Sequence, residues 1–243
     1  KGTEVRTGTQ YTPDGSPNLS DLTFLPKAGF TGSVQIGYEG TDSRGKTFRG
    51  QIRIQVNQGS GSRYFQDMGS YAWAAPYVDL LYEAGVITGT GGQRYRPADA
   101  VSRGDFMLML YRAFQLTPAS GAGFPDVPPG SYYAQAIQAA RAAGIASGYP
   151  DGGFHPQEHV TRQDAMVLLE RTMQATGWSL GAANTGYLSG FRDGGMVAPY
   201  AQEAMSHMIE YGIITGTPEQ KLNPIQSISR AEMAVMLARA ITF

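Results

Sequence analysis

Three arginines of the sequence stand where a carboxylate could be bound. Arg103, Arg162 and Arg230 each follow a Ser or Thr and each stand two residues ahead of an acid. This places them at the first residue of a predicted helix, where a cation costs about 0.3–1 kcal/mol against the helix dipole. Together with free N–H groups of a first helical turn, a guanidinium can instead hold a carboxylate in bidentate geometry. We therefore expect ligand contact. The alternative is an ion pair of each arginine with the acid at the third position of its own helix or with Asp67, Asp126 or Asp193, which would join neighbouring copies.

Aromatic side chains recur at a second matched position and would suit a sugar ligand. They are Trp73, Tyr132 and Tyr200, and we expect them on the first helix of each copy of the pattern. An aromatic face can stack on a sugar ring while its polar tip stays free to hydrogen-bond. The equal alternative is burial, because a repeated aromatic residue often serves the core.

Glycines and aspartates complete the set of matched positions. Gly85, Gly144 and Gly212 fit helix ends, where glycine adopts a left-handed conformation that other residues resist. A missing side chain would also let a ligand approach the backbone. The aspartates are expected first as turn or cap residues and second as ligand contacts. They are Asp67, Asp126 and Asp193.

An internal repeat must position all of these residues. The three glycines are spaced by 59 and 68 residues, and the three arginines keep the same two spacings. Each copy reads as Phe-x-Asp, a first helix, a Gly-rich turn, an x-Pro step and a second helix. The longer second spacing indicates a loop insertion around 179–189, where small and polar residues dominate. The prolines with the same spacings are Pro97, Pro156 and Pro224.

Each second helix is predicted by its start signal and its apolar spacing. Ser or Thr at the N-cap, with an acid three residues later, makes a capping box. Apolar residues follow at a spacing of 0, 1, 4 and 8, which gives one stripe too narrow to form a core alone. We predict a mainly α fold in which the second helices form a central three-helix bundle with pseudo-threefold symmetry, leaving three grooves between copies. The stripes are Phe106, Met107, Leu110 and Phe114; Ala165, Met166, Leu169 and Met173; Met233, Ala234, Leu237 and Ile241.

Residues 1–57 follow the period of β-strands. Strand patterns cover 22–25, 32–38 and 47–56, and the last two face each other across a turn at 42–45. A unit of this size is expected to be the C-terminal part of a larger β domain. The predicted domains are a β-rich segment at 1–57, a flexible linker at 58–62, and repeats at 63–121, 122–178 and 189–243.

Composition argues against several classes of function. The chain has 19 Lys and Arg against 20 Asp and Glu, no Cys and 3 His. This balance does not predict a nucleic-acid partner. It also gives no reason to expect a metal or a cofactor, and no apolar run is long enough for membrane insertion. No acidic pair recurs at matched positions, so we expect no catalytic residues.

The repeat resembles the S-layer homology module. Copies of that module run Phe-x-Asp, an aromatic helix, Gly-Ile-x-x-Gly, Phe-x-Pro and a Thr-Arg-Ala-Glu-like motif, usually three in tandem. Residues 63–243 match this layout, and Ser229-Arg230-Ala231-Glu232 is the copy nearest to the last motif. The other two copies depart from it at Gly104, at Gln163 and at their aspartates. The three copies therefore need not bind a ligand with equal affinity. Residues 24–32 and 42–45 resemble the end of a bacterial immunoglobulin- or cadherin-like domain.

The resemblance implies a noncatalytic, extracellular anchor on a bacterial cell wall. Such modules hold S-layer or other surface proteins to a secondary cell-wall polymer, commonly one with a pyruvate ketal, or to modified peptidoglycan. The implied fold is a three-pronged spindle on a three-helix bundle. We therefore expect grooves that bind an acidic glycan, with the three arginines on a carboxylate and the three aromatics flanking the sugar. The alternative is a protein-interaction module that binds peptides or neighbouring S-layer subunits.

Overall fold

The computed structural model describes residues 32–41, 45–56, 61–121 and 123–242. This part of the chain is mainly helical, with one two-stranded sheet near its N-terminal end. The strand expected at 22–25, turn residues 42–44 and linker residues 57–60 lie outside the described residues. The motif at 24–32 is described only at its last residue.

The predicted hairpin is confirmed. Strand β1 (Gly32–Thr41) pairs antiparallel with β2 (Thr47–Val56), and Val34 faces Ile54 across the pair. Both of these side chains are half-buried, whereas Gln35 and Arg53 on the opposite face are exposed. Side chains alternate between the two faces of a strand, so the period-two pattern produces one apolar and one polar face.

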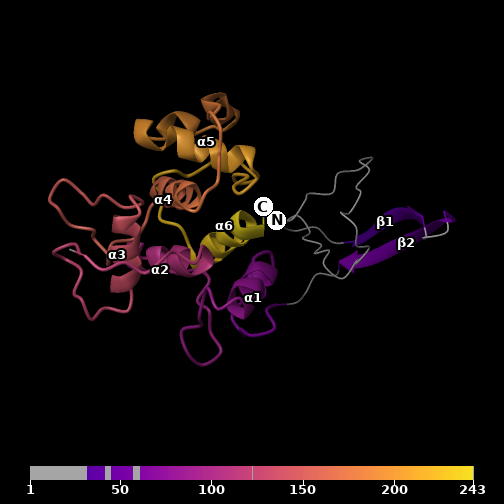
Figure 1. Cartoon of the computed structure of the whole chain (residues 1–243), viewed down its shortest axis with the longest axis horizontal. Coiled ribbons are helices and arrows are strands. Elements are labelled where there is room, and N and C mark those ends of the chain that lie inside the picture. The colour runs from indigo at the N-terminus through magenta and orange to yellow at the C-terminus, as the bar shows by residue number, and fades with distance from the viewer. Residues whose placement is uncertain (1–31, 42–44, 57–60, 122, 243) are drawn as a thin grey trace.

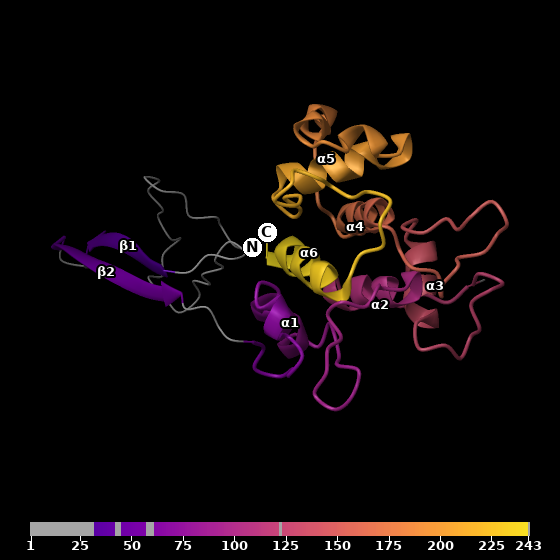
Figure 2. The same ribbon diagram turned by 180° about the vertical axis from the view of Figure 1, so that it is seen from behind.

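Six α-helices form most of the remaining described part, two in each repeat. Figures 1 and 2 show α2, α4 and α6 in the middle, with α1, α3 and α5 outside them. The first helix packs on the second helix of a different repeat: α1 on α6, α3 on α2 and α5 on α4. Each repeat therefore depends on a neighbour for its core. The bounds are α1 (Ala75–Glu83), α2 (Arg103–Ala113), α3 (Ala134–Ala142), α4 (Arg162–Ala175), α5 (Gln202–Glu210) and α6 (Arg230–Thr242).

The predicted capping residues and apolar stripes are confirmed. The hydroxyl of Ser102 accepts the N–H of Asp105 at 3.1 Å, and the other two copies do the same. Only Glu232 also reaches back to the N–H of its N-cap residue, Ser229, at 2.9 Å; Asp105 instead accepts the Ser102 hydroxyl. All stripe residues are buried except Phe114 and Ile241, which pack partly buried against the core.

The segments that lead into α2, α4 and α6 join the three repeats. Short antiparallel bridges pair Ala100 with Ser229, Ser102 with His159, and Thr161 with Ser227. Each of these bridges links a different pair of repeats. The starts of the second helices, and hence the three arginines, are therefore fixed relative to one another by backbone hydrogen bonds.

The insertion between the second and third repeats is more ordered than a simple loop. Residues Thr185–Gly190 form a 3-10 helix, η3, and Asn184 caps it by accepting the N–H of Gly186 at 3.1 Å. Leu188 is buried, and η3 packs on α5. The prediction of a loop is wrong for this part, because one leucine among small residues suffices to dock a short helical turn.

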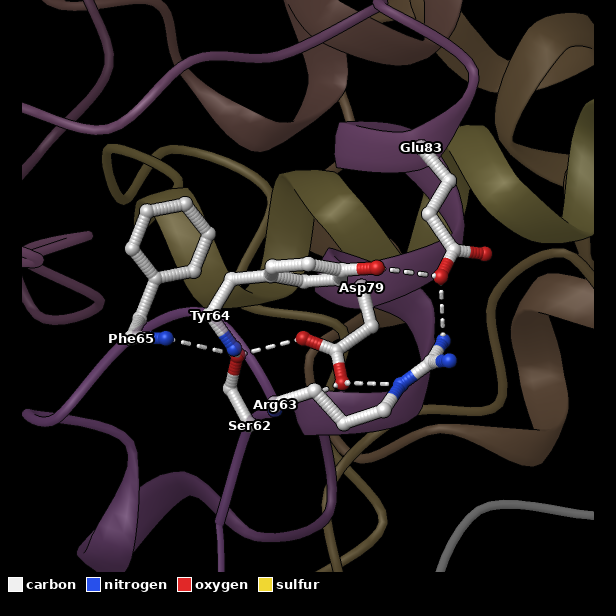
Figure 3. A network of polar contacts seen from close by, with 6 residues as sticks. All are labelled: Ser62, Arg63, Tyr64, Phe65, Asp79 and Glu83. Carbon is white, nitrogen blue, oxygen red and sulfur yellow. Dashed lines mark hydrogen bonds and ion pairs between the residues drawn. The ribbon is translucent and has the colours of Figure 1, made fainter.

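A polar cluster attaches the start of the first repeat to α1 (Figure 3). The carboxylate of Asp79 is buried and accepts the hydroxyl of Ser62 and the backbone N–H of Arg63. The Arg63 guanidinium also contacts Glu83 at 2.7 Å, and Glu83 accepts the hydroxyl of Tyr64. The chain is therefore held to the helical part from Ser62 onward.

Candidate functional site

The three arginines occupy the first position of α2, α4 and α6, as predicted. Their backbone N–H groups, however, are not free for a ligand. Arg103 donates to Glu158 O at 2.8 Å, Arg162 to Gln226 O at 2.8 Å, and Arg230 to Asp99 O at 2.9 Å. The next N–H in each helix also donates to another repeat, to Pro156, Pro224 and Pro97 respectively. The expectation of free first-turn N–H groups is therefore wrong, because each helix start is capped by a neighbouring repeat.

Arg103 is buried, yet part of its guanidinium remains unpaired. Its Nε donates to the carbonyl of Phe154 at 3.1 Å, and its Cζ lies 4.9 Å from the ring centroids of both Tyr149 and Phe154. These aromatic faces stabilise the cation. Among the described residues, neither terminal nitrogen of Arg103 has a hydrogen-bond or ion-pair partner, so a ligand can still bind there.

Arg230 makes a similar arrangement with the first repeat, with one aromatic ring instead of two and with one terminal nitrogen paired. Its Nε donates to Tyr95 O at 2.8 Å, its Nη2 to Thr88 O at 3.1 Å, and its Cζ lies 4.5 Å from the Tyr95 ring. Tyr95 is itself fully buried and donates its hydroxyl to Arg230 O. The arginine is therefore held by contacts to uncharged groups and keeps an uncompensated positive charge.

Arg162 departs from this arrangement. The residue matched to Tyr95 and Phe154 is Leu222, which offers no aromatic face. Arg162 instead pairs with Glu232 of the third repeat, with Nη1 and Oε1 3.0 Å apart, while its buried Nε has no partner among the described residues. Arg162 thus forms an ion pair, but with the helix-start acid of another repeat instead of its own acid or a Phe-x-Asp aspartate.

The three aromatic residues are exposed rather than part of the core. Trp73 is 40% exposed, Tyr132 67% and Tyr200 61%. Each lies two residues before the first residue of α1, α3 or α5, so the predicted place on the helix is wrong by two residues. The tyrosine hydroxyls donate to Asp105 at 2.7 Å and Asp164 at 2.8 Å. Partial burial and these carboxylates raise the pKa of Tyr132 and of Tyr200 to about 12.

One groove, here called the Arg103 groove, brings these groups together. It has a volume of about 250 Å³ and takes its lining from all three repeats: Arg103 from the first, Tyr149 and Asp164 from the second, and Tyr200 from the third. The repeat spacing assigns matched positions to the other two arginines, and we call these two sets the Arg162 site and the Arg230 site. A cation between aromatic rings suits a ligand with both a carboxylate and an apolar face.

A second arginine of the groove was missed in the sequence. Arg171 lines the Arg103 groove and donates to Ile145 O at 3.3 Å. Its matched residues make the same contact in the other repeats, Arg112 to Val86 O and Arg239 to Ile213 O. These three arginines share the spacing of 59 and 68 residues, so the repeat did contain the signal.

The three aspartates hold the turn that carries the groove. Asp126 accepts the N–H groups of Phe154 and His155 at 2.9 and 2.7 Å, and Asp67 and Asp193 bind the matched pairs. Burial opposes ionisation, but the two backbone bonds outweigh it and lower the pKa of Asp67 and of Asp126. These contacts are those of turn-stabilising residues.

The predicted glycines end the first helices in left-handed conformation. Gly85, Gly144 and Gly212 have φ of +69°, +72° and +68°. A different glycine lines the groove: a Cβ on Gly148 would lie 2.6 Å from the Phe124 ring and 2.9 Å from the carbonyl of Gly153. Gly148 therefore allows the loop to approach the ring of its own Phe-x-Asp motif.

Within the described ranges, no group of three or more His, Asp or Glu side chains could hold a metal ion. No helix of the described part is long and apolar enough to cross a membrane.

The chain matches the family model of the S-layer homology domain three times. The matched residues are 64–107, 123–166 and 190–234. Together with the interlocked helix pairs, the matches define a class of protein, a noncatalytic anchoring module made of tandem repeats. The chain belongs to the S-layer homology domain family.

Similar proteins include surface-layer proteins and an enzyme. The chain is 29% identical over 73% of its length to the surface-layer 125 kDa protein of Lysinibacillus sphaericus, covering 14% of that protein. It is 24% identical over 74% of its length to an S-layer protein of Bacillus thuringiensis subsp. finitimus, covering 21% of it. It is also 28% identical over 72% of its length to an endoglucanase of Bacillus sp. (strain KSM-635), covering 18% of it.

The chain thus spans about a fifth or less of the length of these relatives. Its family and its surface-layer relatives identify it as a cell-wall anchoring module of a bacterial cell-surface protein. The match to the endoglucanase covers too little of that enzyme to carry its activity to this chain.

Proposed function

We propose that the chain anchors its parent protein by binding a pyruvylated, acidic glycan of the bacterial cell wall in the grooves between repeats. The observation that carries this proposal is the Arg103 groove, where an arginine with unpaired terminal nitrogens lies between aromatic rings. Arginine binds a carboxylate through two parallel hydrogen bonds, and a ketal-linked carboxylate on a sugar offers that acceptor next to an apolar ring face.

The proposal assigns a role to each matched residue. Arg103 meets the carboxylate, Tyr200 flanks the sugar, and Arg171 lines the same groove as a second cation. Gly144 ends its helix, and Asp126 holds the loop with Tyr149 in place. The same roles are proposed for the matched residues of the other repeats: Arg162, Arg230, Trp73, Tyr132, Gly85, Gly212, Asp67 and Asp193.

We further propose that α2, α4 and α6 form a central bundle with pseudo-threefold symmetry. The three repeat units are then 63–121, 122–178 and 189–243, preceded by the end of a β domain at 1–57 and a linker at 58–62. The cyclic backbone bonds from Arg103, Arg162 and Arg230 to the neighbouring repeats support this arrangement.

Binding to purified cell-wall sacculi tests the ligand. The chain should sediment with sacculi and should be released after mild acid removal of pyruvate ketals. Arg103→Lys keeps the charge but loses the planar fork, so it should weaken binding more than Arg141→Lys, a matched control. Arg141 also lies over an aromatic ring and donates to a backbone carbonyl, but away from the groove. Undiminished binding to depyruvylated sacculi would falsify the proposal in favour of modified peptidoglycan.

The second candidate function is binding of peptides or of neighbouring S-layer subunits, including copies of this chain. The exposed Tyr132 and Tyr200 favour it, since tyrosine is enriched in protein interfaces. Concentration-dependent association of the chain in sedimentation, without affinity for sacculi, would support this candidate instead.

A further inference from the structure

The three arginine sites are not chemically equivalent, and Glu232 makes the difference. In the Arg103 groove the acid at the third helical position is Asp164, which accepts the hydroxyls of Thr161 and Tyr200. At the Arg230 site Asp105 does the same with Ser102 and Tyr132. In both sites the carboxylate accepts a tyrosine hydroxyl and an N-cap hydroxyl, and among the described residues the arginine forms no ion pair.

The Arg162 site has two substitutions at these positions. The residue matched to the tyrosines is Trp73, which has no hydroxyl, and the residue matched to the aspartates is Glu232, which is longer by one methylene. Glu232 keeps its N-cap contacts to Ser229 through Oε2, and its Oε1 reaches Arg162 at 3.0 Å. The side chains of Arg162 and Glu232 are only 14% and 39% exposed.

The ion pair with Glu232 leaves one hydrogen-bond donor of Arg162 unpaired within the described part of the chain. In the other two sites the arginine Nε donates to the carbonyl of the neighbouring repeat. The Nε of Arg162 is buried without a partner among the described residues. The guanidinium is therefore drawn toward Glu232, and this contact replaces the carbonyl bond found in the other two sites.

We infer that Glu232 acts as an internal carboxylate that occupies the Arg162 site, so that the chain offers two open anion sites, at Arg103 and Arg230, and one closed site. This inference rests on the proposed function and specifies which of its sites take the glycan carboxylate. An acidic ligand at the Arg162 site would have to displace an ion pair that is already made and partly desolvated, whereas the other two arginines have none to lose.

The test counts sites on the whole chain. The probe is a methyl hexosaminide carrying a 4,6-linked pyruvate ketal, titrated into the chain labelled with ¹⁵N-arginine. We expect calorimetry to give two sites and the Nε–H resonances of Arg103 and Arg230 to shift, with that of Arg162 unchanged. In Glu232→Gln we expect three sites and a shift of Arg162 as well, and Glu210→Gln, an exposed matched control, should keep two.

Each outcome separates the inference from the proposed function. Three sites in the unaltered chain, or two in a folded Glu232→Gln variant, would overturn the inference and leave the proposed function in place. Trp73→Tyr combined with Glu232→Asp restores the tyrosine–aspartate pair found in the Arg103 groove. This double variant should also give three sites, which guards against a folding defect of the first variant. No shift of any arginine in any chain would overturn the proposed function and the inference with it.

Discussion

The hydroxyl of Tyr200 donates a hydrogen bond to Oδ1 of Asp164 at 2.8 Å, which joins the third repeat to the second beside the Arg103 groove. Burial and this carboxylate raise the pKa of Tyr200 to about 12. Because the folded-state pKa lies above the value of about 10 for free tyrosine, the contact contributes its full stability below about pH 10 and loses it as the pH rises toward 12.

Alkaline titration of tyrosine absorbance tests this contact. The difference between the chain and its Tyr200→Phe variant should be one ionisation with a midpoint near 12. In Asp164→Asn the midpoint should fall, since the charged acceptor is gone while the ring keeps its place. A midpoint near the ordinary value of about 10 in the unaltered chain would show that the contact does not form.

The turn held by Asp126 should depend on both of its backbone bonds. Asp126→Asn leaves one acceptor oxygen for two N–H groups, so we expect a loss of about 1–3 kcal/mol in the free energy of unfolding, measured in urea. The exposed Glu210→Gln should stay within about 0.5 kcal/mol. Because the folded-state pKa of Asp126 is lowered, its contribution is present above about pH 4 and is lost as the pH falls through the folded value. Equal acid sensitivity of chain and variant would contradict this assignment.

Local signals in the sequence identified the elements but not the way they interlock. The boxes with Ser or Thr followed by an acid three residues later, and the apolar spacing, predicted α2, α4 and α6, because caps and helical stripes are properties of one segment. Nothing local shows that α1 packs on α6, or that the N–H of Arg103 is taken by Glu158. These contacts depend on which repeats become neighbours in space.

The sequence identified the arginines at the helix starts, but it did not identify all of the residues around them. Arg171 shares the spacing of Arg103 and could have been found, but it lies within a helix, where arginine is a common surface residue. The exposure of Tyr200 could not be predicted, since a repeated aromatic residue fits the core equally well. The pairing of Arg162 with Glu232 could not be predicted from the sequence, because the two residues belong to different repeats.

The glycine that ends each first helix should resist substitution for a conformational reason alone. Gly144 has φ of +72°, and a Cβ there would meet nothing within 4 Å. Gly144→Ala should therefore cost about 1–2 kcal/mol through backbone strain. Gly130→Ala, with equal space and no such φ, should change stability little. Equal melting temperatures for the two variants would rule out the strain.

Gly148→Ala should destabilise the fold for a different reason, because the new Cβ has too little space. Gly148→Ala places a Cβ against Phe124 and against a backbone carbonyl that cannot move aside. We expect a larger loss of stability than for Gly144→Ala, because overpacking adds about 1–3 kcal/mol to the strain at φ of +80°. The same variant should also weaken binding to sacculi, since Gly148 lines the Arg103 groove. A fully stable Gly148→Ala variant would contradict the close approach.

Arg171 should separate binding from folding. It is exposed, and its contact with Ile145 O is long at 3.3 Å, so Arg171→Ala should change stability by less than about 0.5 kcal/mol. If it binds the glycan through a charge-assisted hydrogen bond, its loss should weaken binding to sacculi about 10- to 100-fold. Arg141→Ala serves as the control outside the groove. Equal retention of both variants on sacculi would remove Arg171 from the site.

The cluster around Asp79 should determine where the ordered repeat region begins. Asp79 is 5% exposed and accepts the N–H of Arg63 at 2.9 Å together with the Ser62 hydroxyl. The matched residues in the other repeats are Gln138 and Ser206, so this attachment is particular to the first repeat. In Asp79→Asn we expect amide hydrogen exchange to accelerate at 63–65 while α4 stays protected, because α1 keeps its apolar contacts to α6. Glu83→Gln, which alters only the exposed side of the cluster, should have a smaller effect. If exchange at 63–65 were unchanged in Asp79→Asn, the attachment would have to come from the packing of Phe65 on Tyr95 instead.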